Sequence, residues 1–201
     1  MVITKNLNQK FALISVFDKG NLRYLCTNLK KYNYNFVSSG STGERIRKMG
    51  FKCKDISKVT KSKEMFDGRV KTINSLIYSS LLYKRENISH TKQFLSLKIP
   101  EIDIVVVNLY PFKRYLRKQN KDKIIEMIDI GGPSLLRASG KNFKYITPIM
   151  DINDYKKLIQ NIHKNNGVTD IIFRKNMAAK VYKQISSYDN IISKWLYEKK
   201  L

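Results

Sequence analysis

The segment Ile102-Asp103-Ile104-Val105-Val106-Val107, just after Pro100, is the clearest strand signal in the sequence. All of its residues except Asp103 are β-branched and apolar. A short, nearly continuous apolar run of this kind is typical of a strand buried in a parallel sheet. Residues 11–16 form a second such run. Because strand-like runs alternate with helical patterns along the chain, the sequence predicts an α/β fold with a central, mostly parallel sheet and helices on both faces.

Weaker signals extend this pattern in both directions. We expect further strands at residues 35–38, 53–56 and 145–149. We expect helices at residues 21–32, just before Gly50, and at residues 154–164. A longer helix is expected after Thr169, which can cap it. We therefore expect one domain over residues 1–201, with a core at about 10–150 and a helical part at about 151–201.

Composition narrows the class of protein. The chain is 42% hydrophobic, and no apolar run approaches the roughly 20 residues that span a bilayer. The N-terminus shows no apolar segment of signal-peptide length. Cys26 and Cys53 form no CxxC motif and no metal-ligand spacing with His90 or His163. We expect a cytoplasmic protein that uses neither a metal nor a cofactor and does not bind a membrane.

The net charge of +23 is large. A basic patch would indicate a nucleic acid or another polyanion. The lysines are instead spread along the whole chain, and lysine, asparagine and isoleucine, all with AT-rich codons, are jointly abundant. We interpret the charge as the result of a biased genome, so a nucleic-acid partner is not expected. Such a charge would still attract a phosphorylated substrate.

Polar loops follow the expected strands, where doubly wound sheets bind ligands. Asp18 and Lys19 follow the first strand. Lys19 could bind a phosphate, or the loop could be an ordinary helix cap. After the second strand, small and hydroxyl residues precede a helix, where backbone N–H groups and the helix dipole favour an anion over a plain turn. These residues are Ser39, Gly40, Ser41 and Thr42.

Two further loops carry candidate binding groups. In the segment Arg69-Val70-Lys71-Thr72, an extended backbone would place the two cations on one face, beside an anion or in solvent. Asn108 ends a buried strand, where an unpaired amide is costly. Tyr110 precedes a proline, which favours extended geometry. Its ring could point into a cleft or into the core.

The segment Asp129-Ile130-Gly131-Gly132-Pro133 is a glycine turn that leads into a helix ending near Lys141. The glycines allow a close approach of the backbone to a ligand. A carboxylate and an amine at opposite ends of this short unit are a candidate proton-transfer pair. A helix cap with a solvated lysine is an equally good interpretation of this segment alone.

Taken together, residues 67–72, 108–112 and 128–133 resemble the N-terminal domain of the bifunctional purine-synthesis protein that joins inosine monophosphate (IMP) cyclohydrolase to AICAR transformylase. The order and spacing of these motifs match, and weaker similarity covers nearly the whole chain. No residues remain for the transformylase domain, so we expect a stand-alone cyclohydrolase. The resemblance implies a methylglyoxal-synthase-like, three-layer fold and a homodimer.

The resemblance also implies a reaction and its residues. Formyl-AICAR loses water and closes the second purine ring to give IMP, without metal or cofactor. Mapped by motif, the catalytic residues are Lys71, Tyr110, Asp129 and Lys141. The implied nucleotide contacts are Asp18, Lys19, Ser39, Gly40, Ser41, Thr42, Arg69, Val70, Lys71, Thr72, Asn108, Asp129, Ile130 and Gly131.

Some positions depart from the family pattern. Asn74-Ser75 and residues 77–80 replace a His-Pro and a glycine-containing loop of the family. This replacement could alter how the loop presents Lys71. Ser41 replaces a glycine of the phosphate loop, and Phe17 replaces a serine. The alternatives are methylglyoxal synthase, which should lack these three motifs, and a non-catalytic relic of the fold that binds a purine nucleotide or RNA.

Overall fold

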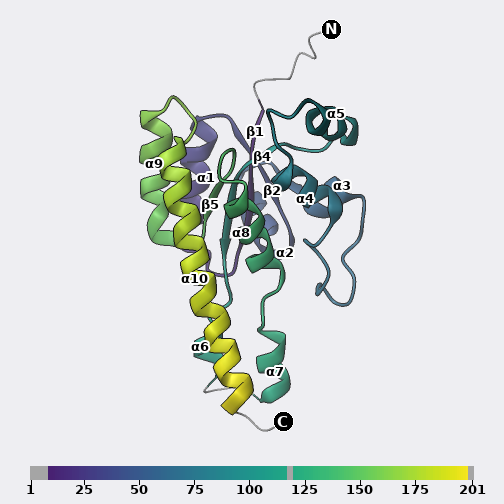
Figure 1. Cartoon of the computed structure of the whole chain (residues 1–201), viewed down its shortest axis with the longest axis vertical. Helices are drawn as coiled ribbons and strands as arrows, with labels where there is room; N and C mark the ends of the chain where they lie inside the picture. The colour runs from purple at the N-terminus through teal and green to yellow at the C-terminus, as the bar shows by residue number, and fades with distance from the viewer. Residues whose placement is uncertain (1–8, 117–119, 199–201) are drawn as a thin grey trace.

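The computed structural model describes residues 9–116 and 120–198, and within them five parallel strands form one sheet in the order β3-β2-β1-β4-β5 (Figure 1). The strands are β1 (Lys10–Val16), β2 (Tyr34–Ser38), β3 (Cys53–Asp55), β4 (Ile102–Asn108) and β5 (Thr147–Ile149). The α/β fold with a mostly parallel sheet expected from the sequence is confirmed, and the sheet is all-parallel. Every expected strand is present, with ends shifted by one or two residues.

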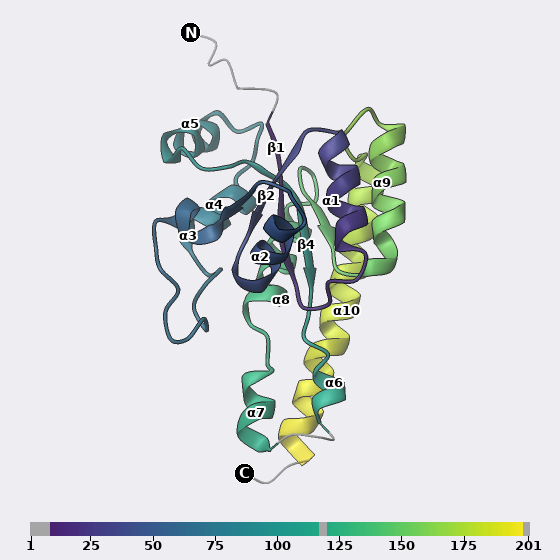
Figure 2. The same cartoon turned by 180° about the vertical axis from the view of Figure 1, so that it is seen from behind.

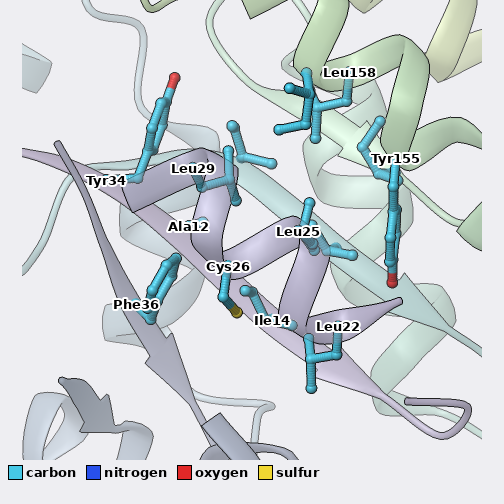
Figure 3. Packing of buried hydrophobic residues seen from close by; sticks show 14 of the residues in the cluster. Ala12, Ile14, Leu22, Leu25, Cys26, Leu29, Tyr34, Phe36, Tyr155 and Leu158 are labelled. Atoms are coloured by element: carbon cyan, nitrogen blue, oxygen red, sulfur yellow. The ribbon is translucent and has the colours of Figure 1, made fainter. Parts of the chain in front are cut away.

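One face of the sheet is covered by α1 (Leu22–Lys31), α2 (Gly40–Lys48) and α9 (Tyr155–Lys164). In α1, Leu22, Leu25, Cys26 and Leu29 recur at helical spacing and are all buried. Figure 3 shows them packed between the strands and α9. Burying a leucine side chain contributes about 1.5–3 kcal/mol, so this stripe holds α1 against the sheet.

The other face is covered by α3 (Ile56–Thr60), α4 (Ser75–Leu82), α8 (Gly131–Lys141) and α10 (Ile171–Glu198). The remaining helices are α5 (Ile88–Leu97), α6 (Phe112–Tyr115), α7 (Lys121–Glu126) and the short 3-10 helix η1 (Ile152–Asp154). The C-terminal half of α10 extends beyond the sheet and carries α6 and α7 alongside it (Figure 2). The rings of Phe112, Tyr188 and Trp195 form the apolar centre of this extension.

The structure corrects three sequence interpretations. Residues 74–80, treated as an altered loop, begin helix α4, and the Asn74 side chain caps it by accepting from the Leu76 N–H at 2.9 Å. Helices α4 and α5 were not identified because their apolar residues show little helical periodicity. The long C-terminal helix is capped by Asp170, which accepts from the Phe173 N–H at 2.7 Å, and not by Thr169, whose hydroxyl bonds to Thr147 at 2.7 Å.

The order of the strands decides where a ligand can bind. β1 pairs with β2 on one side and with β4 on the other, and the chain winds outward in opposite directions from this point. Val16 at the end of β1 lies opposite Asn108 at the end of β4. The loops after these strands therefore separate here and leave a crevice at the carboxyl edge of the sheet.

None of the helices in the described part of the chain, including the 28-residue α10, is both long and apolar enough to cross a membrane.

The contact of α10 with η1 contains a nearly buried carboxylate that gives a stability prediction. Lys180 Nζ lies 2.5 Å from Asp154 Oδ2 and 2.9 Å from Asp151 Oδ2, and the Asp154 side chain is only 2% exposed. Lys180→Met should lower the free energy of unfolding by about 3 kcal/mol, because it removes the cation that contacts this buried carboxylate most closely. Urea denaturation measures this change.

Lys157→Met is the matched control, since this exposed lysine lies 3.7 Å from the same carboxylate. This variant should lower the free energy of unfolding by less than about 1 kcal/mol. Equal losses in the two variants would contradict the prediction.

Candidate functional site

A cavity of about 670 Å³ opens at the crevice between the carboxyl ends of β1, β2 and β4. Its size suits a small organic ligand. It is lined by the ends of β1 and β4, the residue after β2, the start of α2, the segment before α4, the end of α7 and the turn that begins α8. The lining residues are Ser15, Val16, Phe17, Lys19, Ser39, Gly40, Ser41, Thr42, Asp67, Gly68, Arg69, Lys71, Thr72, Val107, Asn108, Tyr110, Ile125, Glu126, Ile128, Asp129, Ile130, Gly131, Gly132 and Leu135.

The start of α2 has the features of an anion site. The first N–H groups of a helix have no intrahelical partners, and the Ser39 side chain makes no capping hydrogen bond to them. Gly40 has a φ of +50°, which glycine adopts without strain. Ser41 does not share this positive φ, so the serine that replaces a glycine of the family pattern is accommodated. The positive end of the α2 dipole thus faces the cavity.

The Thr42 side chain fixes the position of α2 at this site. Its hydroxyl donates to the Val16 carbonyl at 2.9 Å and accepts from the Val16 N–H at 3.2 Å. This side chain is 4% exposed, and it ties the first turn of α2 to the end of β1.

Two side chains of the segment before α4 lie against glycines. A Cβ atom at Gly40 would be 2.6 Å from Lys71 Nζ, and one at Gly131 would be 2.6 Å from Thr72 Oγ1. The absence of a side chain at both glycines lets the Lys71 ammonium reach α2 and the Thr72 hydroxyl reach α8. Lys71 Nζ also lies 3.1 Å from Glu64 Oε2. The Lys71 ammonium, which is paired with Glu64, therefore lies beside the first turn of α2.

Arg69 lies at the mouth of the cavity and forms an ion pair with Glu126 of α7, with Nε 3.2 Å from Oε2. Both side chains are exposed. Exposed pairs contribute little to stability, so a ligand anion can compete with Glu126 for the guanidinium. A turn at Asp67 and Gly68, both with positive φ, presents Arg69 at this position.

Asn108 fastens the loop after β1. Its Oδ1 accepts from the Asp18 N–H at 3.0 Å, and its Nδ2 donates to the Asp18 carbonyl at 2.9 Å. The Asp18 carboxylate accepts from the Gly20 N–H at 2.8 Å and does not line the cavity. Lys19 does line it, with its ammonium donating to the carbonyls of Val16 and Phe17 at 3.4 and 3.3 Å.

Asp129 is one of three acidic residues that line the cavity, with Asp67 and Glu126. Its Oδ1 accepts from the Gly132 N–H at 2.8 Å, and its own N–H donates to the Tyr188 hydroxyl of α10 at 2.9 Å. A Cβ at Gly132 would be 2.5 Å from Asp129 Oδ2, so a larger residue would displace the carboxylate. Burial raises the pKa of Asp129, against the opposing effect of the Gly132 hydrogen bond. A carboxyl group with a raised pKa is better suited to take up a proton near neutral pH.

Most of the residues expected from the sequence meet at this cavity, including the candidate catalytic residues Lys71, Tyr110 and Asp129. Among the expected nucleotide contacts, Asp18 and Val70 do not line it. Val70 instead forms an isolated bridge with Met65.

Lys141 does not lie at this cavity either. It is the exposed last residue of α8, and ten residues of helix separate it from Gly131 by about 15 Å. The proposed proton-transfer pair of Asp129 and Lys141 is therefore not formed within one chain. A catalytic role of Lys141 stays a prediction that only the family resemblance implies.

Eleven lining residues were not among the expected contacts, and Phe17, Glu126 and Gly132 are three of them. Phe17 was noted only as a departure from the family pattern. Its position directly after a buried strand was an available signal, because the carboxyl ends of parallel strands meet at one edge. For Glu126 no sequence signal exists, since its contact with Arg69 depends on the placement of α7.

A second cavity of about 600 Å³ adjoins the first across residues 128–130. It lies between the start of α8 and the end of α10, and its lining is mainly apolar, with Ile192, Leu196 and Tyr197 on one side. It lacks the cationic groups of the first cavity. The candidate site is therefore the first cavity.

Within residues 9–116 and 120–198, no group of three or more His, Cys, Asp or Glu side chains is arranged to hold a metal ion.

Two family models match the chain. Residues 21–134 match the MGS-like domain, and residues 139–201 match the AICARFT/IMPCHase bienzyme. The cavity thus lies mainly within the first match, and α10 belongs to the second.

Similar proteins agree with these matches. The chain is 43% identical over 190 residues to the bifunctional purine biosynthesis protein PurH of Clostridium botulinum (strain Loch Maree), covering 94% of this chain and 38% of that protein. It is 40% identical over 189 residues to the PurH protein of Magnetococcus marinus, covering 93% and 36%. The crystal structure of ForH superposes with a TM-score of 0.81 at 25% identity, covering 92% of this chain and 95% of that one. The chain spans little more than a third of the length of these curated relatives.

The contact between Tyr188 and Asp129 gives a prediction about the site. Tyr188→Phe keeps the ring among Phe112 and Trp195 but removes the acceptor of the Asp129 N–H. It should lower the free energy of unfolding by about 1–2 kcal/mol, because a partly buried donor loses its partner. The Asp129 amide proton should also exchange faster with solvent. Hydrogen exchange and urea denaturation measure the two effects.

The matched control is Tyr182→Phe on the same helix. Its hydroxyl donates to the Arg137 carbonyl at 3.2 Å in an exposed position, and its loss should change stability by less than about 0.5 kcal/mol. Unchanged exchange at Asp129 in Tyr188→Phe would show that α10 does not support this turn.

Proposed function

The chain belongs to the MGS-like domain family and matches the IMP cyclohydrolase portion of the bifunctional purine biosynthesis proteins, and on this premise we propose that it closes the ring of formyl-AICAR to give IMP and water. One observation carries this proposal. The cavity at the crevice of the sheet brings Lys71, Tyr110 and Asp129 together beside the start of α2. Three groups suited to proton transfer and charge stabilisation thus border the same space as a phosphate site.

Binding of the nucleotide follows from the charges of the cavity. The 5′-phosphate binds the first N–H groups of α2, with Arg69 and Lys19 nearby. The carboxamide and the formamide of the imidazole then lie toward Asp129 and Tyr110. The reaction is intramolecular, so holding the two arms within contact distance supplies much of the rate enhancement.

The chemistry divides into an addition and a loss of water. In the addition, the carboxamide nitrogen forms a bond to the formyl carbon, and its proton passes to Asp129. The electron pair of the formyl C=O bond moves to oxygen, where the Lys71 ammonium and the Tyr110 hydroxyl stabilise the charge and return a proton. Because Lys71 lies at the cavity, we assign this proton to its ammonium. In the second step, the C–O bond breaks, the leaving hydroxyl takes the proton held by Asp129 and departs as water, and the formamide nitrogen gives its proton to the neutral Lys71 amine.

The homodimer implied by the family resemblance stays a prediction.

The direct test is to add formyl-AICAR to the purified protein and to follow IMP in the ultraviolet. Formation of IMP above the rate of the uncatalysed reaction is the expected result. Binding of IMP without turnover would instead favour the non-catalytic alternative, and binding of neither nucleotide would overturn the proposal.

Asp129→Asn tests the proton acceptor and its burial together. The amide keeps an oxygen to accept from Gly132 but takes up no proton, so kcat should fall by about 10²–10⁴.

The raised pKa of Asp129 means that the folded chain binds more protons than the unfolded chain above the ordinary value of 3.8. The contribution of Asp129 to stability therefore decreases as pH rises through this window. The variant should be at least as stable as the native chain at pH 7, and the difference should vanish below pH 3.8. Thermal unfolding over a pH series measures it, and a less stable variant at pH 7 would contradict the assignment.

Two lysine variants test which cation acts. Lys71→Met should lower kcat by about 10²–10³, the usual effect of removing one group that stabilises developing charge. Lys141 lies outside the cavity of its own chain. Lys141→Met should therefore keep kcat within about threefold of the native value. Steady-state kinetics with formyl-AICAR compares the two. A loss in Lys141→Met as large as that in Lys71→Met would show that Lys141 reaches a cavity other than that of its own chain.

A further inference from the structure

We propose that the ring of Phe17, together with that of Tyr110, forms an aromatic surface that binds the heterocycle of the nucleotide and thereby contributes to its specificity. This inference rests on the proposed function. It concerns a residue that the proposed chemistry does not use.

The two rings lie side by side because of the register of the sheet. β1 and β4 are neighbours, with Val16 opposite Asn108, and Phe17 and Tyr110 follow these residues at the same edge. The ring centroids are 4.9 Å apart with an angle of 52° between the planes. Phe17 is 41% exposed and Tyr110 is 40% exposed, and both line the cavity. The pair thus presents apolar ring surface to the space where the ligand would lie.

The Phe17 backbone is held on both sides. Before it, Val16 exchanges two hydrogen bonds with the Thr42 hydroxyl. After it, Asp18 exchanges two with the Asn108 amide. The Phe17 carbonyl itself accepts from Lys19 Nζ at 3.3 Å. These contacts fix the backbone that carries the ring, and the contact with Tyr110 orients the ring before a ligand arrives, so less entropy is lost on binding.

The chemistry of the ring selects the part of the ligand that it contacts. A phenyl side chain offers neither a donor nor an acceptor, and it would gain nothing from a phosphate or from the hydroxyls of a ribose. It gains from covering apolar surface and from offset or edge contacts with another π-system. The heterocycle is the one part of the nucleotide with a π-face. The cations at the start of α2 and the rings of Phe17 and Tyr110 thus suit opposite ends of one ligand.

The test compares a ligand that has a base with one that lacks it. Binding of IMP and of ribose 5-phosphate is measured by titration calorimetry with the native chain and with Phe17→Ser. Loss of one base-stacking contact should raise the Kd for IMP about 10-fold. The Kd for ribose 5-phosphate should change by less than about twofold. Phe17→Tyr, which keeps the ring, should restore the affinity for IMP, whereas Phe17→Leu, which keeps only apolar bulk, should not.

Tyr24→Ser is the matched control. Tyr24 lies on α1, is 42% exposed and does not line the cavity, so its variant should bind both ligands as the native chain does. Equal losses for IMP and ribose 5-phosphate in Phe17→Ser would overturn the inference, because the ring would then act through the phosphate site. An unchanged Kd for IMP in Phe17→Ser, or no binding of IMP to the native chain, would also overturn it. Failure of the proposed function alone would be recognised by IMP binding without conversion of formyl-AICAR.

Discussion

The pairing of β1 with β4 is the constraint on which the rest of the structure depends. It sets Val16 opposite Asn108, and it is the point from which the chain winds outward in both directions. Because the carboxyl ends of parallel strands lie at one edge, the sheet itself brings the loops after β1, β2 and β4 together there. The Asn108 amide then uses its donor and its acceptor on the backbone of Asp18. A side chain expected to contact the nucleotide thus has a structural task, which is to hold two loops at a fixed separation.

At this edge of the sheet, the glycines are as important as the residues with side chains. Gly40, Gly131 and Gly132 each stand where a Cβ would come within 2.6 Å of a polar atom of the site. These three positions set how closely Lys71, Thr72 and Asp129 approach the backbone. The same crowding removes water from Asp129 and raises its pKa. Its ionised form is therefore costly for the fold, whereas the proposed reaction needs it as the proton acceptor, a common conflict between stability and activity.

The C-terminal helix connects the two parts of the chain that different family models match. α10 packs on the sheet through Val181 and Ile185, and further on its Tyr188 accepts from the Asp129 N–H. The turn that carries the acid is thus supported from a segment about sixty residues later in the sequence. This arrangement gives residues 139–201 a physical role in the site, although α10 lines only the neighbouring apolar cavity.

The amino-acid sequence by itself determined the parallel sheet, the apolar stripe of α1 and the loops that carry Lys71, Tyr110 and Asp129, since these follow from local periodicity and from the common edge of parallel strands. It could not determine helix α4, whose apolar residues surround the helix, nor the cap of α10, where Thr169 and Asp170 are both suitable and only packing against Thr147 decides. The tertiary structure alone placed Phe17 beside Tyr110 and Arg69 beside Glu126. It also separated Lys141 from Asp129, because a rigid helix of known rise keeps its two ends apart whatever the chemistry of its residues suggests.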